Sequence, residues 1–121
     1  MKYLVCDDSK MARKMLIKSL KDLVQNDAEI IEATNGQEAV EQYEKFSPDI
    51  IFMDLTMPIM SGFDAVKHIC QKDKNAKIIV VSADIQEGSM QKAKANGALG
   101  FIKKPVSSES LEPILNKLEV L

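Results

Sequence analysis

The sequence predicts an α/β fold: five parallel β-strands, each followed by a helix, in a doubly wound sheet of strand order 2-1-3-4-5. Two observations lead to this prediction. Short apolar runs alternate five times with longer segments whose apolar residues recur at helical spacing. The runs at residues 50–53 and 77–81 are almost wholly apolar, as strands covered on both faces of a parallel sheet must be.

The first three elements follow from apolar spacing and from the polar residues that end each run. Residues 3–6 form an apolar run that stops at two aspartates, and we expect a strand there. Residues 9–25 carry apolar side chains at helical spacing, with Ser9 as the expected N-cap. Residues 28–33 form the second expected strand.

The middle of the chain repeats this alternation. An Asn-Gly pair at residues 35–36 is a turn signal, and residues 37–46 then have the spacing of a helix. Residues 49–53 are the third expected strand. A loop with a proline and a glycine follows, and residues 63–72 are the next helix.

The last four elements complete the pattern. Residues 77–81 and 99–103 are expected strands, and residues 86–96 are expected to form a helix that ends at Gly97. Residues 106–121 form the last helix. Pro113 lies inside that pattern, so it should fall in or near the first turn or else kink the helix.

Composition narrows the class of protein. The chain has 121 residues and a formal net charge of −2, a length suited to one domain and a charge unsuited to a dedicated nucleic-acid binder. Cys6 and Cys70 form no CxxC pair and give no sign of a disulfide framework or a zinc site. No apolar run has the length of a membrane span. We therefore expect a single domain over residues 1–121, cytoplasmic and monomeric, without an output domain and without nucleic-acid or membrane partners.

Polar residues follow four of the predicted strands. Asp7 and Asp8 come after the first strand, Asp54 after the third, Ser82 after the fourth, and two lysines and Pro105 after the fifth. The carboxyl ends of parallel strands share one edge of the sheet, and ligands bind there where the strand order reverses. Three carboxylates, a hydroxyl and a lysine are therefore expected at one site.

This set of groups favours phosphoryl transfer. Clustered carboxylates repel one another unless some are protonated or a cation lies among them. Oxygen ligands without histidine or cysteine favour a hard ion such as Mg²⁺. A lysine can bind a phosphate, and the hydroxyl of Ser82 can donate to a phosphate oxygen. Asp54, on the central strand, is the expected nucleophile, since an aspartate can form an acyl phosphate.

The chain resembles the response-regulator receiver family from end to end. The segments that carry the resemblance are VCDDS, FMDLTMPIMSG, VVSAD and GFIKKP, at residues 5–9, 52–62, 80–84 and 100–105. The resemblance implies that Asp54 is the phosphoacceptor. It implies that Asp8, Asp54 and the backbone carbonyl of Thr56 bind Mg²⁺, with Asp7 close by and acting through water.

The resemblance also assigns the remaining positions of the site. It implies that Ser82 and Phe101 are the switch hydroxyl and aromatic, and that Lys104, directly before the proline, binds the phosphate. It implies that Thr56 and Asp84 tune the lifetime of the acyl phosphate, and that the Lys104–Pro105 bond is cis. Where Tyr and Thr are frequent, this chain has Phe101 and Ser82.

The expected function is that of a two-component response regulator rather than an enzyme. A sensor histidine kinase would phosphorylate Asp54, and the surface of the last two helices and the fifth strand would then bind a partner. We expect a CheY-like chemotaxis messenger whose target is a flagellar motor switch protein. A phosphorelay intermediate that passes phosphate to a histidine phosphotransfer protein is the alternative. An aspartyl-nucleophile phosphatase would need an acid where Thr56 stands, and a flavodoxin-like electron carrier would place its FMN phosphate beside acidic residues.

Overall fold

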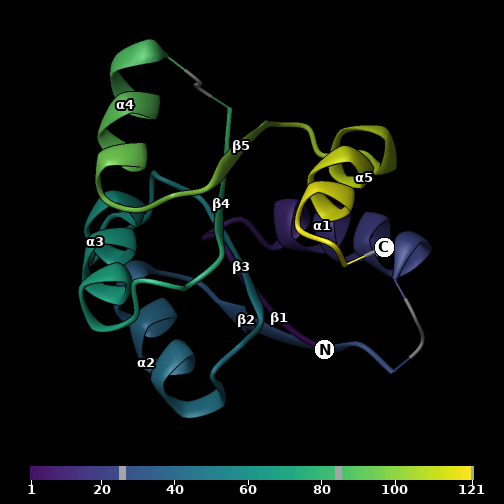
Figure 1. The fold of residues 1–121 in the computed structure, drawn as a ribbon, viewed down its shortest axis with the longest axis horizontal. Coiled ribbons are helices and arrows are strands. Elements are labelled where there is room, and N and C mark those ends of the chain that lie inside the picture. The colour runs from purple at the N-terminus through teal and green to yellow at the C-terminus, as the bar shows by residue number, and fades with distance from the viewer. Residues whose placement is uncertain (25–26, 84–85, 121) are drawn as a thin grey trace.

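The computed structural model describes residues 1–24, 27–83 and 86–120 and shows five strands alternating with five helices (Figure 1). The strands are β1 (Lys2–Cys6), β2 (Glu29–Ala33), β3 (Ile50–Met53), β4 (Ile78–Ser82) and β5 (Gly100–Lys103). The helices are α1 (Lys10–Leu23), α2 (Gly36–Phe46), α3 (Gly62–Lys72), α4 (Glu87–Ala95) and α5 (Ser108–Lys117).

The strands form one parallel sheet in the order β2-β1-β3-β4-β5, which confirms the predicted topology. Strand β1 pairs on both edges, with Leu4 opposite Ile31 of β2 and Ile51 of β3. In Figure 1, α1 and α5 cover one face of the sheet, and α2, α3 and α4 cover the other. The three inner strands, β1, β3 and β4, therefore bury both of their faces, whereas the edge strands β2 and β5 keep exposed residues.

Alternation along the strands divides the core into two clusters. Val5 and Phe52 point to the face covered by α1 and α5, where Leu16, Leu20, Leu111 and Leu115 pack. Cys6 and Met53, the next residue of each strand, point to the opposite face. Because side chains alternate between the two faces along a strand, a residue's position in the sequence determines which face of the sheet its side chain reaches.

Side-chain caps start the helices close to where the sequence predicts. Ser9 accepts a hydrogen bond from the Ala12 N–H and is the N-cap of α1, as expected. Asn35 caps α2 in the same way, and Gly36 is the first helical residue. The Asn-Gly pair is therefore the start of a helix rather than a separate turn, because the Asn35 side chain satisfies a free N–H of the first turn.

The helix ends differ more from prediction. The helix expected at residues 106–121 begins two residues later, since Ser107 and Ser110 form a capping box, and its helical span stops at Lys117. Pro113 is the sixth residue of α5, so it lies just beyond the first turn. Its side chain is exposed, and the ring therefore stays outside the core. Gln25, the expected end of the first helix, lies outside the described residues.

Two glycines bring the loop after β3 against its neighbours. A Cβ on Gly62 would lie 1.9 Å from the backbone oxygen of Asp54, and one on Gly36 would lie 2.1 Å from that of Met60. The Gly36 N–H also donates to the Met60 carbonyl at 2.9 Å. These contacts tie the segment that follows Asp54 to the starts of α2 and α3.

Within the described part of the chain, none of the helices is both long enough and apolar enough to cross a bilayer.

Candidate functional site

Three carboxylates meet where β1 and β3 end. Asp7 and Asp8 follow β1, and Asp54 follows the neighbouring strand β3. One oxygen from each carboxylate lies within 4.8 Å of the others. Asp7 and Asp54 are each only 5% exposed, whereas Asp8 is exposed to solvent. The structure therefore brings together the three acids that the sequence predicts.

Lys104 completes this cluster. Its ammonium nitrogen lies 2.5 Å from Asp7 Oδ2 and 3.6 Å from Asp54 Oδ2. Its backbone N–H donates to the Ser82 carbonyl at 2.9 Å, and the Lys104–Pro105 bond is cis, as predicted. The adjacent Lys103 is exposed. Of the two lysines after β5, Lys104 is thus the one in contact with the acids.

Burial and the neighbouring acids disfavour the ionised form of Asp54. Burial, together with repulsion by Asp7 and Asp8, raises the pKa of Asp54 to about 6, although Lys104 and a hydrogen bond from the Thr56 backbone N–H oppose the rise. A single lysine therefore does not neutralise the cluster. A further cation next to Asp54, the nucleophile expected from the sequence, would stabilise the ionised carboxylates.

The donor set fits a hard divalent cation. Among the described residues, the cluster offers carboxylate oxygens only, and two of the three acids are buried. Oxygen donors of this kind suit Mg²⁺, which keeps several waters and binds through one or two carboxylates. The exposed Asp8 leaves one side of the cluster open to solvent, as a partly hydrated ion requires.

An apolar cavity flanks the acids on the α1 and α5 side. It measures about 360 Å³, and its wall includes Asp7 and Lys104 together with Met15, Phe52 and Val81. Apolar walls lower the local dielectric and strengthen interactions between charges. The pair formed by Asp7 and Lys104 therefore lies between a charged site and an apolar wall.

The predicted switch residues lie on the other side of the sheet. Ser82 ends β4 and is 5% exposed. Phe101 is half-buried against the cluster covered by α2, α3 and α4. Val81 and Ile102 precede and follow these residues on the opposite face, so Ser82 and Phe101 share a side by alternation. Phe101 and Ile102 therefore point to opposite faces of the sheet.

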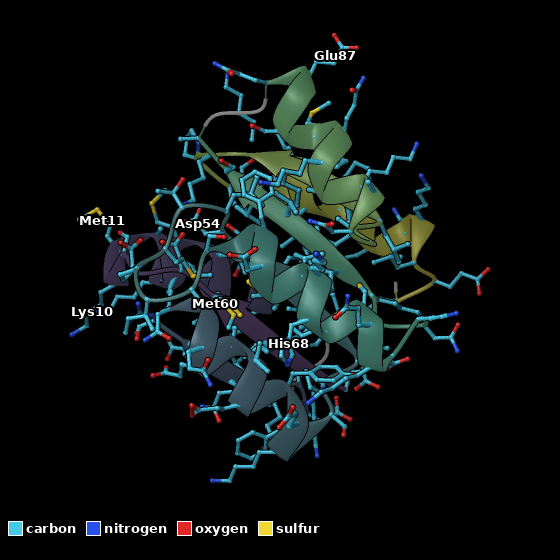
Figure 2. The ribbon with its side chains drawn as sticks, turned by 90° about the vertical axis from the view of Figure 1, so that its left-hand side faces the viewer. Lys10, Met11, Asp54, Met60, His68 and Glu87 are labelled. Carbon is cyan, nitrogen blue, oxygen red and sulfur yellow. The ribbon has the colours of Figure 1, made fainter. Side chains whose placement is uncertain are left out.

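The remaining predicted positions are only partly described. The side chain of Thr56 is exposed beside the acids, and its backbone N–H binds Asp54. The use of its carbonyl as a metal ligand stays a prediction. Asp84, the second expected tuning residue, lies outside the described residues. In Figure 2, Asp54 lies toward the side of the molecule that carries Lys10 and Met11 of α1, with His68 lower down on α3.

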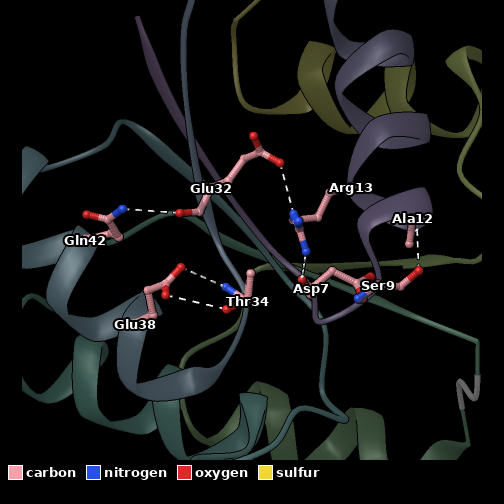
Figure 3. Close-up of polar contacts among 8 residues, drawn as sticks. All are labelled: Asp7, Ser9, Ala12, Arg13, Glu32, Thr34, Glu38 and Gln42. Atoms are coloured by element: carbon pink, nitrogen blue, oxygen red, sulfur yellow. Dashed lines mark hydrogen bonds and ion pairs between the residues drawn. The ribbon is translucent and has the colours of Figure 1, made fainter.

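A further contact was not anticipated from the sequence. Arg13 of α1 donates through Nη1 to the Asp7 carbonyl at 2.8 Å and through Nε to Glu32 Oε1 of β2 at 2.9 Å (Figure 3). Asp7 Oδ1 also accepts a hydrogen bond from the Ser9 N–H at 2.9 Å. A compositional signal was available: Arg13 is the only arginine of the chain, among 16 basic residues.

A known protein family and several relatives match this chain over almost its whole length. The family model of the response regulator receiver domain matches residues 3–116. The chain is 44% identical over 119 residues to the chemotaxis protein CheY of Thermotoga maritima, covering 97% of this chain and 96% of the relative. It is 42% identical over 117 residues to that of Bacillus subtilis, with 96% and 95% covered.

A solved complex resembles the whole structure. The CheX–CheY–BeF₃–Mg²⁺ complex from Borrelia burgdorferi contains a chain with a TM-score of 0.88 and 31% identity, with 98% of this chain and 89% of that chain covered.

Proposed function

Because the chain belongs to the response-regulator receiver family, we propose that Asp54 accepts a phosphoryl group from a sensor histidine kinase. The chain is a CheY-like, non-enzymatic signalling protein. The observation that carries the assignment of Asp54 is the geometry around it: a buried carboxylate with two more acids within 4.8 Å and a lysine at 3.6 Å.

The transfer forms one bond and breaks one. A carboxylate oxygen of Asp54 attacks the phosphorus of the kinase's phosphohistidine, the phosphorus–nitrogen bond breaks, and the imidazole leaves with the bonding electron pair and takes up a proton. Asp54 must be ionised for this step, and with a pKa of about 6 it is ionised at neutral pH. Positioning and charge neutralisation are the main demands of phosphoryl transfer.

The other residues of the site neutralise charge. Asp7, Asp8, Asp54 and the Thr56 carbonyl would hold Mg²⁺, which when bound supplies positive charge for the phosphoryl oxygens. Lys104 lies 3.6 Å from Asp54 and is placed to pair with a phosphoryl oxygen on that side chain. Since Lys104 now contacts Asp7 at 2.5 Å, it would exchange one anionic partner for another.

The response would pass to the surface through Ser82 and Phe101. The Ser82 hydroxyl would bond the new phosphate, and Phe101 would turn into the space that Ser82 leaves. The half-burial of Phe101 beside α4 supports this route. The surface altered would be that of α4, β5 and α5, and we propose a flagellar motor switch protein as the target. Thr56 and Asp84 would tune the lifetime of the phosphate.

We further propose that residues 1–121 act as one cytoplasmic, monomeric receiver domain. The family match over residues 3–116 supports a single unit. Size-exclusion chromatography with light scattering tests the monomer: a mass near 13.5 kDa with and without phosphorylation is expected, and a stable dimer would contradict it.

Phosphorylation by a small donor tests the central proposal. Incubation with acetyl phosphate and Mg²⁺, followed by intact mass spectrometry, should add one phosphoryl group to the wild type and none to Asp54→Asn. A chelator should abolish the gain. An equal gain in Asp54→Asn would overturn the assignment of Asp54, and no gain in the wild type would overturn the function.

The alternative role is a phosphorelay intermediate. Transfer of the phosphoryl group from Asp54 to a purified histidine phosphotransfer protein, faster than hydrolysis, would favour the relay. Phosphorylation-dependent binding to a motor switch protein, without such transfer, would favour the chemotaxis messenger. The half-buried Phe101 fits the messenger better, because a turning aromatic serves a conformational output whereas a relay needs only the transfer site.

A further inference from the structure

We propose that Arg13 is a positioning residue that fixes Asp7 and Asp8 for cation and phosphoryl binding. The inference rests on the function proposed above for the carboxylate site. Within the described residues, the hydrogen bond that joins Arg13 to the acidic cluster ends on the backbone carbonyl of Asp7 rather than on a carboxylate. Its effect on the chemistry would therefore be indirect.

The Asp7 carbonyl belongs to the peptide that joins two of the three acids. A peptide unit is planar, so the direction of this carbonyl fixes the path of the backbone from Asp7 to Asp8. The Asp7 N–H makes the last bond to β2, with the Ala33 carbonyl at 3.0 Å. Since β1 ends at Cys6, the Asp7 carbonyl lies just past the end of the strand. Arg13 supplies its donor at 2.8 Å, as a carbonyl in a partly buried site requires.

The rest of Asp7 is held as well. Oδ1 accepts from the Ser9 N–H at 2.9 Å, and Oδ2 pairs with Lys104 at 2.5 Å. Both side-chain oxygens and both backbone groups of Asp7 thus have partners. Among these contacts, the one from Arg13 directs the peptide toward Asp8, whose own side chain is exposed.

The choice of arginine fits this geometry. A guanidinium is a rigid fork that binds two acceptors at once, whereas a lysine offers one flexible point charge. Arg13 uses the fork in this way, with Nη1 on the Asp7 carbonyl and Nε on Glu32. All 15 other basic residues of the chain are lysines. The Arg13 side chain is only 12% exposed, while that of Glu32 is 50% exposed.

Glu32 anchors the far end of the fork. It belongs to β2, and its own backbone carbonyl accepts a hydrogen bond from the Gln42 side chain of α2 at 3.2 Å (Figure 3). Because the ion pair with Arg13 is half-exposed, its loss should cost little. Replacement of Glu32 therefore removes the ion pair with Arg13 Nε but leaves the hydrogen bond from Arg13 Nη1 to the Asp7 carbonyl, so the two contacts can be tested separately.

The experiment compares Arg13→Ala, Arg13→Lys and Glu32→Gln with a matched control, Lys14→Ala. Lys14 is the next residue of α1, is exposed, and carries the same charge. Two quantities are measured: the Mg²⁺ dissociation constant by calorimetry, and hydrogen exchange of the Ser9 amide in metal-free protein, because that amide donates to Asp7.

Arg13→Ala should weaken Mg²⁺ binding by about tenfold, in the range found for partners of metal ligands, and should speed exchange at Ser9. Arg13→Lys should recover part of both losses. Glu32→Gln and Lys14→Ala should stay within about twofold of wild type, the smaller change expected of exposed charges. If Arg13→Ala unfolds, Arg13→Lys carries the comparison and should still weaken binding more than Lys14→Ala.

Two outcomes would overturn the proposal. One is a loss of thermal stability in the Arg13 variants with Mg²⁺ affinity and Ser9 exchange equal to those of Lys14→Ala, which would show a purely structural contact. The other is Ser9 exchange in metal-free Arg13→Ala equal to that of the wild type. If the wild type itself shows no measurable Mg²⁺ binding, the proposed function fails on the wild type alone, and Ser9 exchange in Arg13→Ala still decides whether Arg13 positions Asp7.

Discussion

At the scale of single residues, the negative charge on Asp54 lowers the stability of the folded protein. Burial and the neighbouring acids raise the pKa of Asp54 to about 6 in the folded protein, against 3.8 for an ordinary aspartate. The folded state therefore binds this proton more tightly than the unfolded state does. The contribution of Asp54 to stability is most favourable below pH 3.8 and is lost as the pH rises through about 6.

Asp54→Asn should consequently stabilise the metal-free protein near pH 7.5, by up to roughly 3 kcal/mol for a pKa difference of this size. The gain should shrink as the pH falls through about 6 toward 4, because Asp54 then becomes protonated in the folded state. Urea unfolding of both proteins at several pH values measures the gap. A gap that does not change with pH would show that the charge of Asp54 is not its source.

The same proton should compete with the cation. Mg²⁺ binds the ionised carboxylates, so its apparent affinity should fall as the pH is lowered through about 6, the pKa of Asp54. Calorimetric titrations at pH 7.5 and 5.5 test this. In Asp54→Asn the pH dependence should be weaker, and an equal dependence in both proteins would assign it to other groups.

Most of the site residues could be predicted because the end of a buried strand is marked in the sequence by the change from an apolar run to polar residues. The acids and Lys104 directly follow apolar runs, and parallel strands bring such positions to one edge. Arg13 could not be found in this way. Its role depends on a carbonyl just past the end of β1, and the bonding of a single carbonyl is a property of three-dimensional structure.

At the scale of elements, close contacts fix where α3 begins. Gly62 is the first residue of α3, and a Cβ there would lie 1.9 Å from the Asp54 backbone oxygen. Neither that oxygen nor the strand behind it can move without displacing the Asp54 side chain. The start of the helix and the expected phosphoacceptor are therefore set by the same contact.

Gly62→Ala should destabilise the fold by about 3 kcal/mol, at the upper end of overpacking effects, and should also weaken Mg²⁺ binding. Gly88→Ala is the control, since Gly88 lies in α4 and no atom of the described residues lies within 4 Å of an added Cβ. It should leave stability unchanged or raise it by up to about 1 kcal/mol. Urea midpoints give both values, and equal midpoints would contradict the steric argument.

Element types could be read from the sequence, whereas several ends could not. The end of α5 was predicted at residue 121, because apolar spacing continues there, but the helix stops at Lys117. The Val120 N–H bonds the Leu115 carbonyl after Glu119 takes a positive φ of 61°. Periodicity alone does not report such a reversal of the backbone.

At the scale of the whole molecule, one sheet supports two separate apolar clusters. Tyr3 belongs to the cluster under α1 and α5, and Tyr43 packs against the cluster under α2, α3 and α4. Neighbouring residues of each strand serve opposite clusters, so neither cluster can be lost while the strands stay in place. The two halves should therefore unfold together.

The two tyrosines make this testable, because the chain has no tryptophan and only these two tyrosines. Tyr43→Phe leaves an emitter in one cluster, and Tyr3→Phe leaves one in the other. Within each variant, the urea transition followed by tyrosine fluorescence should coincide with that followed by circular dichroism at 222 nm. Separated transitions in either variant would show that one face melts before the other.

The solitary arginine has a consequence for proteolysis. A protease that cleaves only after arginine has one possible site in this sequence, after Arg13. The bond lies within α1, and the side chain that the enzyme must bind is held against Asp7 and Glu32. Folded protein should resist cleavage, and a single cut into fragments of 13 and 108 residues should appear only when α1 opens. The rate of that cut would measure how often the helix beside the acidic site detaches.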